Sequence, residues 1–373
     1  MVPDGWEIKP LGEVCELING RGFKPHEWST EGYPIIRIQN LNGSGEFNHF
    51  NGDFNPKILV KPGQLLFAWS GSRGTSFGPH VWHGPDAVLN YHTWKIVTKT
   101  GTDPEFLRQL FEHITTEIEN SAHGAAALVH VQKADMEKRK LLLPALRQQK
   151  KIAEILSTWD KAIETTEKLL ANAEAQKRAL MQQLLTGKRR LKGFEGGEWR
   201  VRRLDAVATI RKGQQKSKMT LLEQGNYPVI NGGVEPSGYT DEWNSDAGTI
   251  TISEGGNSCG FVNLIKQPFW SGGHCYTLEN IRVRRDFLFH CLKFKEAEIM
   301  KLRVGSGLPN IQKRSISAVS VVIPTDREQR QIEEILNDVS FVTTAISNDM
   351  RKLCIEKRAL MQQLLTGKKR VTV

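Results

Sequence analysis

The segment KRALMQQLLTGK stands at 177–188 and again, letter for letter, at 357–368 of this chain of 373 residues. A long identical segment in each half indicates an internal duplication, and both copies of a duplicated unit need similar local structure. Other stretches align at the same displacement of 180 residues: 141–156 (LLLPALRQQKKIAEIL) with 321–336 (VVIPTDREQRQIEEIL), and 130–133 (HVQK) with 310–313 (NIQK). The sequence therefore predicts two copies of one unit, related as a pseudo-twofold internal repeat.

The first part of each copy is typical of short strands joined by glycine-rich turns. In LFAWSGSRGTSFG at 66–78 and GTITISEGGNSCGFV at 248–262, apolar stretches are interrupted by Gly and Ser. A helix is expected to follow in each copy, near 104–114 and 285–294. This mixture predicts the α+β class, with two globular parts of mostly antiparallel sheet and a few helices.

The last forty-odd residues of each copy predict one long helix. No Gly or Pro lies between Pro144 and Gly187, or between Pro324 and Gly367. At ~1.5 Å per residue such a helix is roughly 60 Å long, which is more than a globular core needs. Apolar residues recur three or four positions apart, as in a coiled coil. The predicted seam residues are Ile152, Ile155, Trp159, Leu169, Leu180 and Leu184, and then Ile332, Ile335, Val339, Val342, Leu360 and Leu364.

The ends of these helices carry recognisable signals. Thr325 and Glu328 have the spacing of a capping box, and Gly187 and Gly367 suit the position just beyond a helix C-terminus. A basic run follows each glycine, at 188–190 and 368–370. These runs either complement the helix dipoles or contact phosphate.

Charge and cysteine content narrow the class of protein. Lys and Arg number 51 against 41 Asp and Glu, which gives a net charge of +10 and favours an anionic partner such as nucleic acid. The five cysteines form no CxxC pair, which is typical of the reducing cytoplasm. No apolar run approaches the roughly 18 residues of a membrane span, so we expect a cytoplasmic protein without a membrane partner.

Motifs of common catalytic sites do not occur. The chain has no phosphate-binding GxxxxGK[ST] loop and no HExxH, and His80 and His83 lack the glutamate of a zinc protease. The sequence therefore predicts no catalytic residues and no metal site on this chain.

Several motifs together resemble the specificity subunit of Type I restriction–modification enzymes. They are PIIRIQNLNG at 34–43, KPGQLLFAWSGSRG at 61–74, and the Pro-to-Gly helices that begin with RQQKKIAEIL and REQRQIEEIL. The resemblance covers essentially the whole chain. It implies two target-recognition domains, at 1–144 and 193–324, separated by two conserved helices, at 145–192 and 325–373, that pack as an antiparallel coiled coil.

The resemblance also implies the partners and cofactors. Proteins of this family have no catalytic site, bind double-stranded DNA, and dock two methyltransferase subunits and, in the full complex, restriction subunits. S-adenosylmethionine, ATP and Mg are then expected on the partner subunits and no cofactor on this chain. Two different readers in one chain imitate a dimer that reads half-sites about one helical turn, ~34 Å, or a multiple apart. The identical segments suit helix pairing and the docking of two equivalent partners, because equivalent partners need equivalent surfaces. The long helices suit a spacer of fixed length, since a flexible linker would fix no distance.

Side chains that read base edges are mainly Arg, Lys, Asn and Gln on loops held by a scaffold. The candidates in the first reader are Arg21, Lys24, Arg37, Gln39, Asn42, Arg73, Gln132 and Lys133. The candidates in the second reader are Lys212, Gln214, Gln215, Lys216, Lys218, Asn231, Asn257, Gln312 and Lys313. His92 and His274 fall at equivalent places, where we expect core or sheet histidines.

Two alternatives remain open at this point. One is a coiled-coil scaffold whose globular domains bind proteins or carbohydrate, with an incidental basic charge. The other is a self-contained nuclease, which the missing metal-binding carboxylates disfavour.

Overall fold

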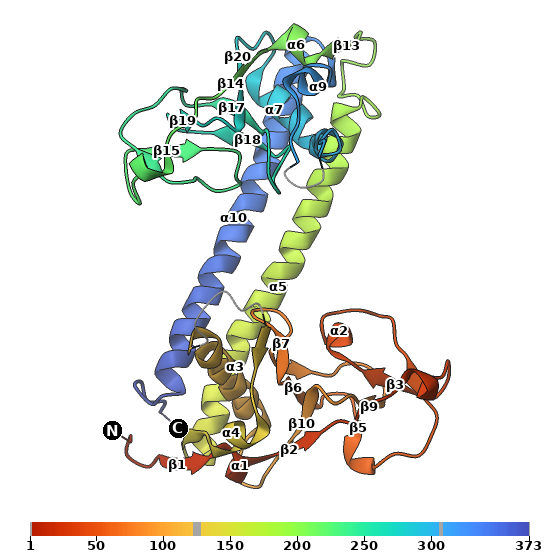
Figure 1. The fold of residues 1–373 in the computed structure, drawn as a ribbon, viewed down its shortest axis with the longest axis vertical. Coiled ribbons are helices and arrows are strands. Elements are labelled where there is room, and N and C mark those ends of the chain that lie inside the picture. Colours follow the sequence, from red (N-terminus) through yellow and green to blue (C-terminus); the bar gives the residue numbers. More distant parts are fainter. Residues whose placement is uncertain (1, 122–127, 306–308, 373) are drawn as a thin grey trace. The chain divides into compact units, whose positions relative to one another are not determined.

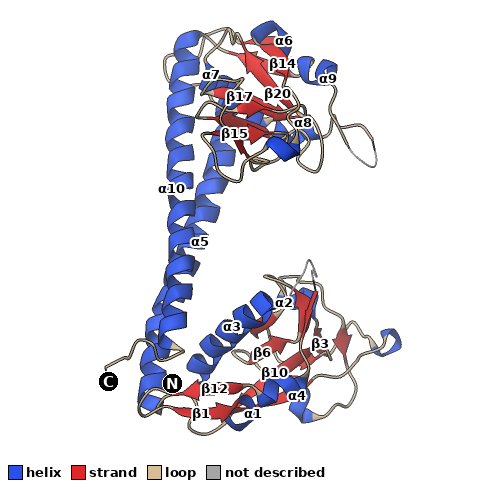
Figure 2. Ribbon diagram, turned by 60° about the vertical axis from the view of Figure 1, so that its left-hand side comes forward, coloured by secondary structure: helices blue, strands red, loops and turns tan. Residues whose placement is uncertain are grey.

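The computed structural model describes residues 2–121, 128–305 and 309–372 (Figure 1). The chain divides into two compact units: unit 1 is Met1–Thr165 with Asp349–Val373, and unit 2 is Thr166–Asn348. Two long helices, α5 (Leu146–Leu185) and α10 (Asp326–Leu364), each contribute one half to either unit. Within each unit these helices lie side by side (Figures 1 and 2).

Unit 1 is built around a four-stranded antiparallel sheet, followed in the chain by helix α3 (Pro104–Ser121). Its strand order is β2 (Cys15–Asn19), β10 (Thr93–Thr98), β6 (Leu65–Ala68) and β8 (Gly78–Val81). A second sheet contains β4 (His49–Phe50), β3 (Tyr33–Ile36), β9 (Ala87–Leu89) and β5 (Leu59–Val60), with β3 and β9 parallel. Two-stranded pairs join β1 (Glu7–Pro10) to β12 (Lys140–Leu143) and β7 (Ser70–Ser72) to β11 (Leu128–His130). Short helices are α1 (Leu11–Val14), α2 (Ile38–Leu41) and α4 (Lys133–Lys138).

Unit 2 repeats this plan. Its four-stranded sheet has the order β14 (Thr209–Lys212), β20 (Cys275–Glu279), β17 (Thr249–Ser253) and β18 (Val262–Ile265). The smaller sheet contains β16 (Tyr239–Thr240), β15 (Tyr227–Ile230) and β19 (Trp270–Ser271), again with one parallel pair. Strand β13 (Arg200–Arg203) pairs with β21 (Ser320–Ile323), and the helices are α6 (Leu204–Val207), α7 (Arg285–Phe294), α8 (Glu296–Met300) and α9 (Lys313–Ser317). The predicted α+β class and internal repeat are confirmed.

Each unit has its own apolar core, formed by the sheet, one amphipathic helix and the long helices. In α3 the buried residues Phe106, Leu110 and Ile114 recur every four positions, so one face of the helix is apolar and packs in the core. Burial of each such side chain contributes about 1.5–3 kcal/mol relative to exposure. In α7, Phe287 and Cys291 occupy the matching positions in the core of unit 2.

A glycine at the end of the first sheet strand is required in both units. A Cβ at Gly20 would lie 2.1 Å from the Asn90 carbonyl oxygen, and one at Gly213 would lie 2.2 Å from that of Gly272. Both glycines donate their N–H into the neighbouring strand, at 3.3 Å to Thr93 O and 2.8 Å to Cys275 O. The duplication therefore extends to the backbone contacts of the sheet.

A buried glutamine ties the start of each long helix to its unit. The Gln149 Oε1 accepts a hydrogen bond from Asp103 N at 2.8 Å, and the Gln329 Oε1 accepts one from Arg284 N at 3.0 Å. Their Nε2 groups donate to Pro144 O and Pro324 O at 2.8 and 2.9 Å. These contacts satisfy polar groups that the buried helix start would otherwise leave unpaired.

The two predicted long helices are confirmed, and they pack together, but two predicted seam residues are wrong. Leu169 and Val342 are 53% and 51% exposed. In α5 the half-buried residue at this point of the helix is Leu170 instead of Leu169. A straight helix has 3.6 residues per turn, whereas alternating steps of three and four residues follow a period of about 3.5. Residues assigned by such steps therefore move gradually away from the contact face of a straight helix.

The helix ends follow the predicted signals in part. Gly187 and Gly367 both have a φ of 70°, the left-handed conformation that terminates many helices and favours glycine. The capping box forms only halfway: Glu328 N donates to Thr325 Oγ1 at 3.4 Å, but the Glu328 carboxylate bonds elsewhere. Among the helices of the described residues, none combines the length and apolarity needed to cross a bilayer.

Candidate nucleic-acid interface

The arginines predicted as readers in unit 1 are held by contacts within the unit. Arg21 donates to Glu27 Oε1 at 2.8 Å, and its guanidinium lies 4.2 Å from the ring centre of Phe23. Arg37 donates to Asn48 Oδ1, and Arg73 donates to Glu119 O. The other candidates, Lys24, Gln39, Asn42 and Gln132, are exposed, and Lys133 is half-buried.

The candidates in unit 2 divide in the same way. Lys216 pairs with Glu242 at 2.9 Å and lies 3.9 Å from the ring centre of Trp270. Asn231 accepts a hydrogen bond from His274 N at 3.1 Å. The exposed candidates are Lys212, Gln214, Gln215, Lys218, Asn257, Gln312 and Lys313. Of these, Lys212 pairs with Glu254 at 2.6 Å and Gln215 Nε2 donates to Lys216 O at 3.2 Å.

The end of the central strand β6 and the end of β17 occupy the same place in the two units. Trp69 N donates to His92 O at 3.3 Å, and Glu254 N donates to His274 O at 2.9 Å. The Trp69 carbonyl oxygen accepts a hydrogen bond from Val131 N at 3.0 Å, and the Glu254 carbonyl oxygen accepts one from Ile311 N at 2.8 Å. The backbone is therefore equivalent at this place, while a tryptophan stands in one unit and a glutamate in the other.

In unit 1 this place is a pocket of about 470 Å³, and four of its nine lining residues have aromatic rings. Its walls are Asn19, Gly20, Trp69, Tyr91, Trp94, His130, Val131, Gln132 and Lys133. Trp69 Nε1 donates to Tyr91 O at 3.0 Å, and the Trp69 and His130 rings meet edge to face with centres 5.0 Å apart. Burial and then the nearby His130 lower the pKa of His92, whose ring centre lies 5.3 Å from that of Trp69, so the His92 imidazole is neutral at pH 7.

In unit 2 the same place holds a polar cluster around the buried Glu254 and Tyr276. The Glu254 Oε1 accepts from Lys212 Nζ at 2.6 Å and from the Tyr276 hydroxyl at 2.9 Å, and Oε2 lies 3.4 Å from His274 Nδ1. Burial raises the pKa of Glu254, but the hydrogen bonds from Lys212 and Tyr276 outweigh it and lower the pKa overall. Glu254 is therefore ionised at pH 7, with Lys212 as its counter-charge.

The sequence analysis did not identify Trp69, Tyr91, His130 or Glu254 as site residues. The available signal was the position of Trp69 and Glu254, which stand directly after the equivalent strands β6 and β17 of a duplicated unit and differ in chemistry. The prediction for His274 was wrong, because its side chain is 62% exposed. It lies directly before β20, whose first residue, Cys275, is buried.

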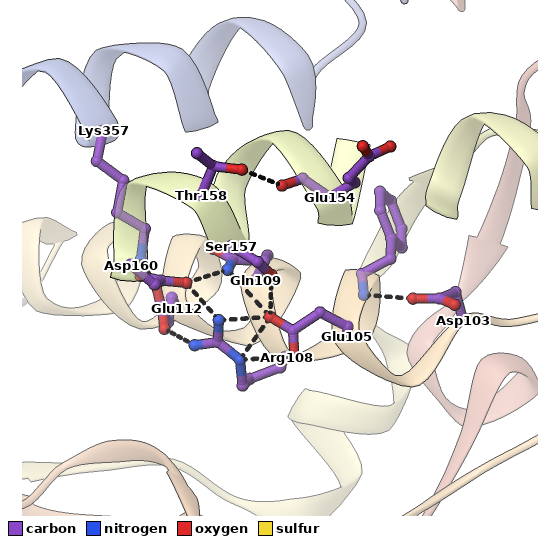
Figure 3. Close-up of polar contacts among 11 residues, drawn as sticks. Asp103, Glu105, Arg108, Gln109, Glu112, Glu154, Ser157, Thr158, Asp160 and Lys357 are labelled. Atoms are coloured by element: carbon purple, nitrogen blue, oxygen red, sulfur yellow. Dashed lines mark hydrogen bonds and ion pairs between the residues drawn. The ribbon is translucent and has the colours of Figure 1, made fainter. Parts of the chain in front are cut away.

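A charged network joins both long helices to α3 in unit 1 (Figure 3). Lys357 Nζ lies 2.5 Å from Asp160 Oδ1 and 2.5 Å from Glu112 Oε2. Arg108 Nη2 lies 2.5 Å from Asp160 Oδ2 and 2.6 Å from Glu105 Oε1 (Figure 3). Burial raises the pKa of Asp160, but Lys357 and Arg108 outweigh it and lower the pKa overall. Lys357 is the first residue of the second identical segment.

Its counterpart in unit 2, Lys177, has a different environment. Burial, and next the positive charge of Lys293, lower the pKa of Lys177. At the place equivalent to Gln109, His290 Nε2 pairs with Asn337 Oδ1 at 2.8 Å. The identical segments therefore have the same backbone but face different neighbours.

The buried and exposed faces of the two identical segments also match. Met181, Leu184 and Leu185 are buried, as are their counterparts Met361, Leu364 and Leu365. These residues lie in the cores of the two units, so the predicted seam residues Leu184 and Leu364 serve packing.

The basic run after the first segment is partly structural. Arg190 donates to both Glu328 oxygens at 2.9 and 3.0 Å, and Trp199 Nε1 donates to Glu328 Oε2 at 2.9 Å. Arg190 therefore holds the start of α10 within unit 2 rather than projecting freely toward an external anion.

A family profile decides what kind of protein this duplication makes. The profile of the Type I restriction modification DNA specificity domain matches twice, over residues 3–175 and 196–357. The chain belongs to this family. It is thus a DNA specificity subunit of a Type I restriction–modification system, which is non-catalytic and generally carries no cofactor.

Relatives match over nearly the full length. The chain is 24% identical to the Type I restriction enzyme MjaVIII specificity subunit of Methanocaldococcus jannaschii, over 99% of this chain and 94% of that protein. A putative Type I restriction enzyme MjaX specificity subunit of the same organism is also 24% identical, over 99% and 95% of the two chains.

The fold is also that of a solved specificity subunit. The crystal structure of the S subunit from M. genitalium superimposes with a TM-score of 0.67 at 17% identity, covering 100% of this chain and 97% of that chain. A chain from a structure on assembly and conformational transition of the Type I system gives 0.56 at 20% identity, over 99% and 100%.

Proposed function

We propose that this specificity subunit reads a bipartite DNA target, with one half-site for each globular part. The observation that carries the proposal is the repeat itself, in which two equivalent backbones present different side chains at the ends of matching strands. The target-recognition domains are 1–144 and 193–324, and 145–192 and 325–373 form the spacer and docking helices. The contact residues are the exposed candidates of each reader, among them Gln39 and Asn42 in the first and Gln214 and Gln215 in the second.

We also propose that the helices fix the distance between the half-sites. Helices α5 and α10 are continuous over 40 and 39 residues, and a continuous paired helix is stiff where a Gly/Ser linker is not. A fixed distance gives a target with one defined gap between its halves.

Two methyltransferase subunits are the proposed partners of the identical segments, and restriction subunits join them in the full complex. Packing accounts for the identity of the buried residues, but not for that of the exposed Arg178, Gln182 and Gln183, which recur as Arg358, Gln362 and Gln363. Two equivalent partners need two equivalent surfaces. S-adenosylmethionine, ATP and Mg then belong to the partners, and the complex works on DNA in the cytoplasm.

The test is DNA binding and methylation by the purified chain, with and without its methyltransferase partner, at stated salt. Methylation is expected only in the mixture and only at a two-part target. Methyl transfer by the chain alone, or binding that ignores DNA sequence, would contradict the proposal. The second outcome would favour a protein- or carbohydrate-binding scaffold.

A further inference from the structure

The pocket of unit 1 combines the side chains that bind a nucleobase. The rings of Trp69 and Tyr91 offer apolar surface to a ligand, with the buried Trp94 behind Trp69, and Asn19 and Gln132 add amides to the lining. Nucleobases stack on aromatic rings of this kind. Lys133, whose Nζ lies 3.6 Å from Glu137 Oε1, adds a positive charge, and none of the nine lining residues is acidic.

The rings are held in place before any ligand arrives. Trp94 stacks on the core residue Phe67 with ring centres 5.7 Å apart and planes at 14°, and Trp69 stacks on Trp94 at 6.1 Å and 21°. This row leads from the core to the pocket. A preorganised ring loses little conformational entropy on binding, which favours affinity.

Comparison of the two units separates shared from individual side chains at this place. Gln132 and Lys133 begin α4, and Gln312 and Lys313 stand in the same relation to α9. By contrast, Trp69 of unit 1 corresponds to Glu254 of unit 2. The residue directly before the equivalent histidines, His92 and His274, is Tyr91 in unit 1 and Gly273 in unit 2. Shared side chains suit the phosphate backbone, which is the same in every sequence. Side chains that differ between the two units at equivalent backbone positions suit contacts with the bases, because the bases differ between half-sites.

We propose that the pocket of unit 1 binds one nucleobase of the first half-site, and that Trp69 and Tyr91 are specificity-determining residues. This inference rests on the function proposed above, and it adds the site and the class of ligand. At the same place in unit 2 the base meets the charged pair of Lys212 and Glu254 instead.

The experiment measures binding of the complex with its methyltransferase partner to DNA in which each base pair of both half-sites is changed in turn. The variants are Tyr91→Ala, at a residue 49% exposed, and Trp69→Leu. Each is expected to reduce discrimination at the same one or two positions of the first half-site by about 5- to 100-fold. Discrimination in the second half-site and the salt dependence of binding remain unchanged, because phosphate contacts are untouched. Trp243→Leu, at a 51% exposed aromatic residue of unit 2, is the matched control.

Two further DNA series show how the base is held. Loss of affinity when thymine is replaced by uracil indicates contact with the methyl edge of a stacked base. Tighter binding to a mismatch indicates a base that has left the stack. In both cases the effect must vanish in Trp69→Leu.

The inference is overturned if both variants keep wild-type discrimination at every position of the first half-site, or lose it equally in both half-sites. Absence of base discrimination by the wild-type complex is a different result. It would count against the proposed function itself.

Discussion

Glu328 is a buried carboxylate at the start of α10 that accepts hydrogen bonds from Arg190 and Trp199. Its substitution Glu328→Gln removes the negative charge and leaves the half-buried Arg190 guanidinium without a counter-ion. Unpaired buried charges are costly, so we expect the free energy of unfolding to fall by about 2–4 kcal/mol, measured by urea denaturation.

Glu334→Gln is the matched control, since Glu334 pairs with Arg330 at 3.0 Å on an exposed face of the same helix. Exposed pairs contribute about 0–1 kcal/mol, so this variant should unfold close to the wild type. Equal destabilisation by the two variants would contradict the role given to Glu328.

Gly20 and Gly213 test whether the two units depend on the same backbone contact. Gly20→Ala places a methyl group 2.1 Å from a carbonyl oxygen, and the expected result is local disorder of unit 1 with loss of reading at the first half-site. Gly213→Ala should affect the second half-site alone. Hydrogen exchange and half-site binding check both, and Gly45→Ala, which has no atom within 4 Å of the new methyl group, is the control. Loss of both half-sites from one substitution would contradict the account.

At the scale of elements, the network around Asp160 couples α3 to both long helices (Figure 3). The pKa of Asp160 is lowered in the folded state, so the ion pairs contribute stability above the unfolded-state pKa of about 4 and lose it as the pH falls through the folded pKa. We expect Asp160→Asn to unfold more easily than the wild type by about 1–3 kcal/mol at pH 7.

The difference between the two proteins should shrink as the pH falls below about 4, because the wild type then loses the same charge. Denaturation at a series of pH values measures this. A difference that stays constant down to pH 2 would show that packing, rather than charge, explains the effect.

Sequence patterns predicted some elements better than others. The long helices follow from local periodicity and from the absence of Gly and Pro, and their terminal glycines follow from backbone conformation. Which polar side chains remain available to DNA depends on tertiary contacts. Arg37 is half-buried and donates to Asn48 Oδ1, whereas Arg73 is exposed and donates to Glu119 O, 46 residues away in the sequence.

Aromatic residues, in contrast to the polar candidates, do not suggest a binding site by residue type. Trp69 and Trp94 suit the core by composition, and Trp94 is indeed buried. The sheet register shows that Trp69 lies at a strand end beside a pocket. The backbone of Glu254 in unit 2 makes the equivalent hydrogen bonds, which shows that the two residues occupy the same place. Such a site is defined by folding and not by spacing along the chain.

At the scale of the whole molecule, the proposed function makes duplication the means by which one chain combines equivalent docking segments with readers of different chemistry. The segments at 177–188 and 357–368 are identical, whereas the strand ends carry Trp69 in one unit and Glu254 in the other. The net charge of +10 favours association with DNA of any sequence, and the readers then supply specificity.

The central claim is that the paired helices set the gap between the half-sites. Four residues inserted into each of α5 and α10, midway along both, lengthen each helix by ~6 Å, which is about one to two base pairs of DNA. Methylome sequencing of cells that carry this variant with its methyltransferase partner measures the gap directly. The account predicts unchanged half-sites with a gap longer by one or two base pairs, and an unchanged gap with full methylation would contradict it.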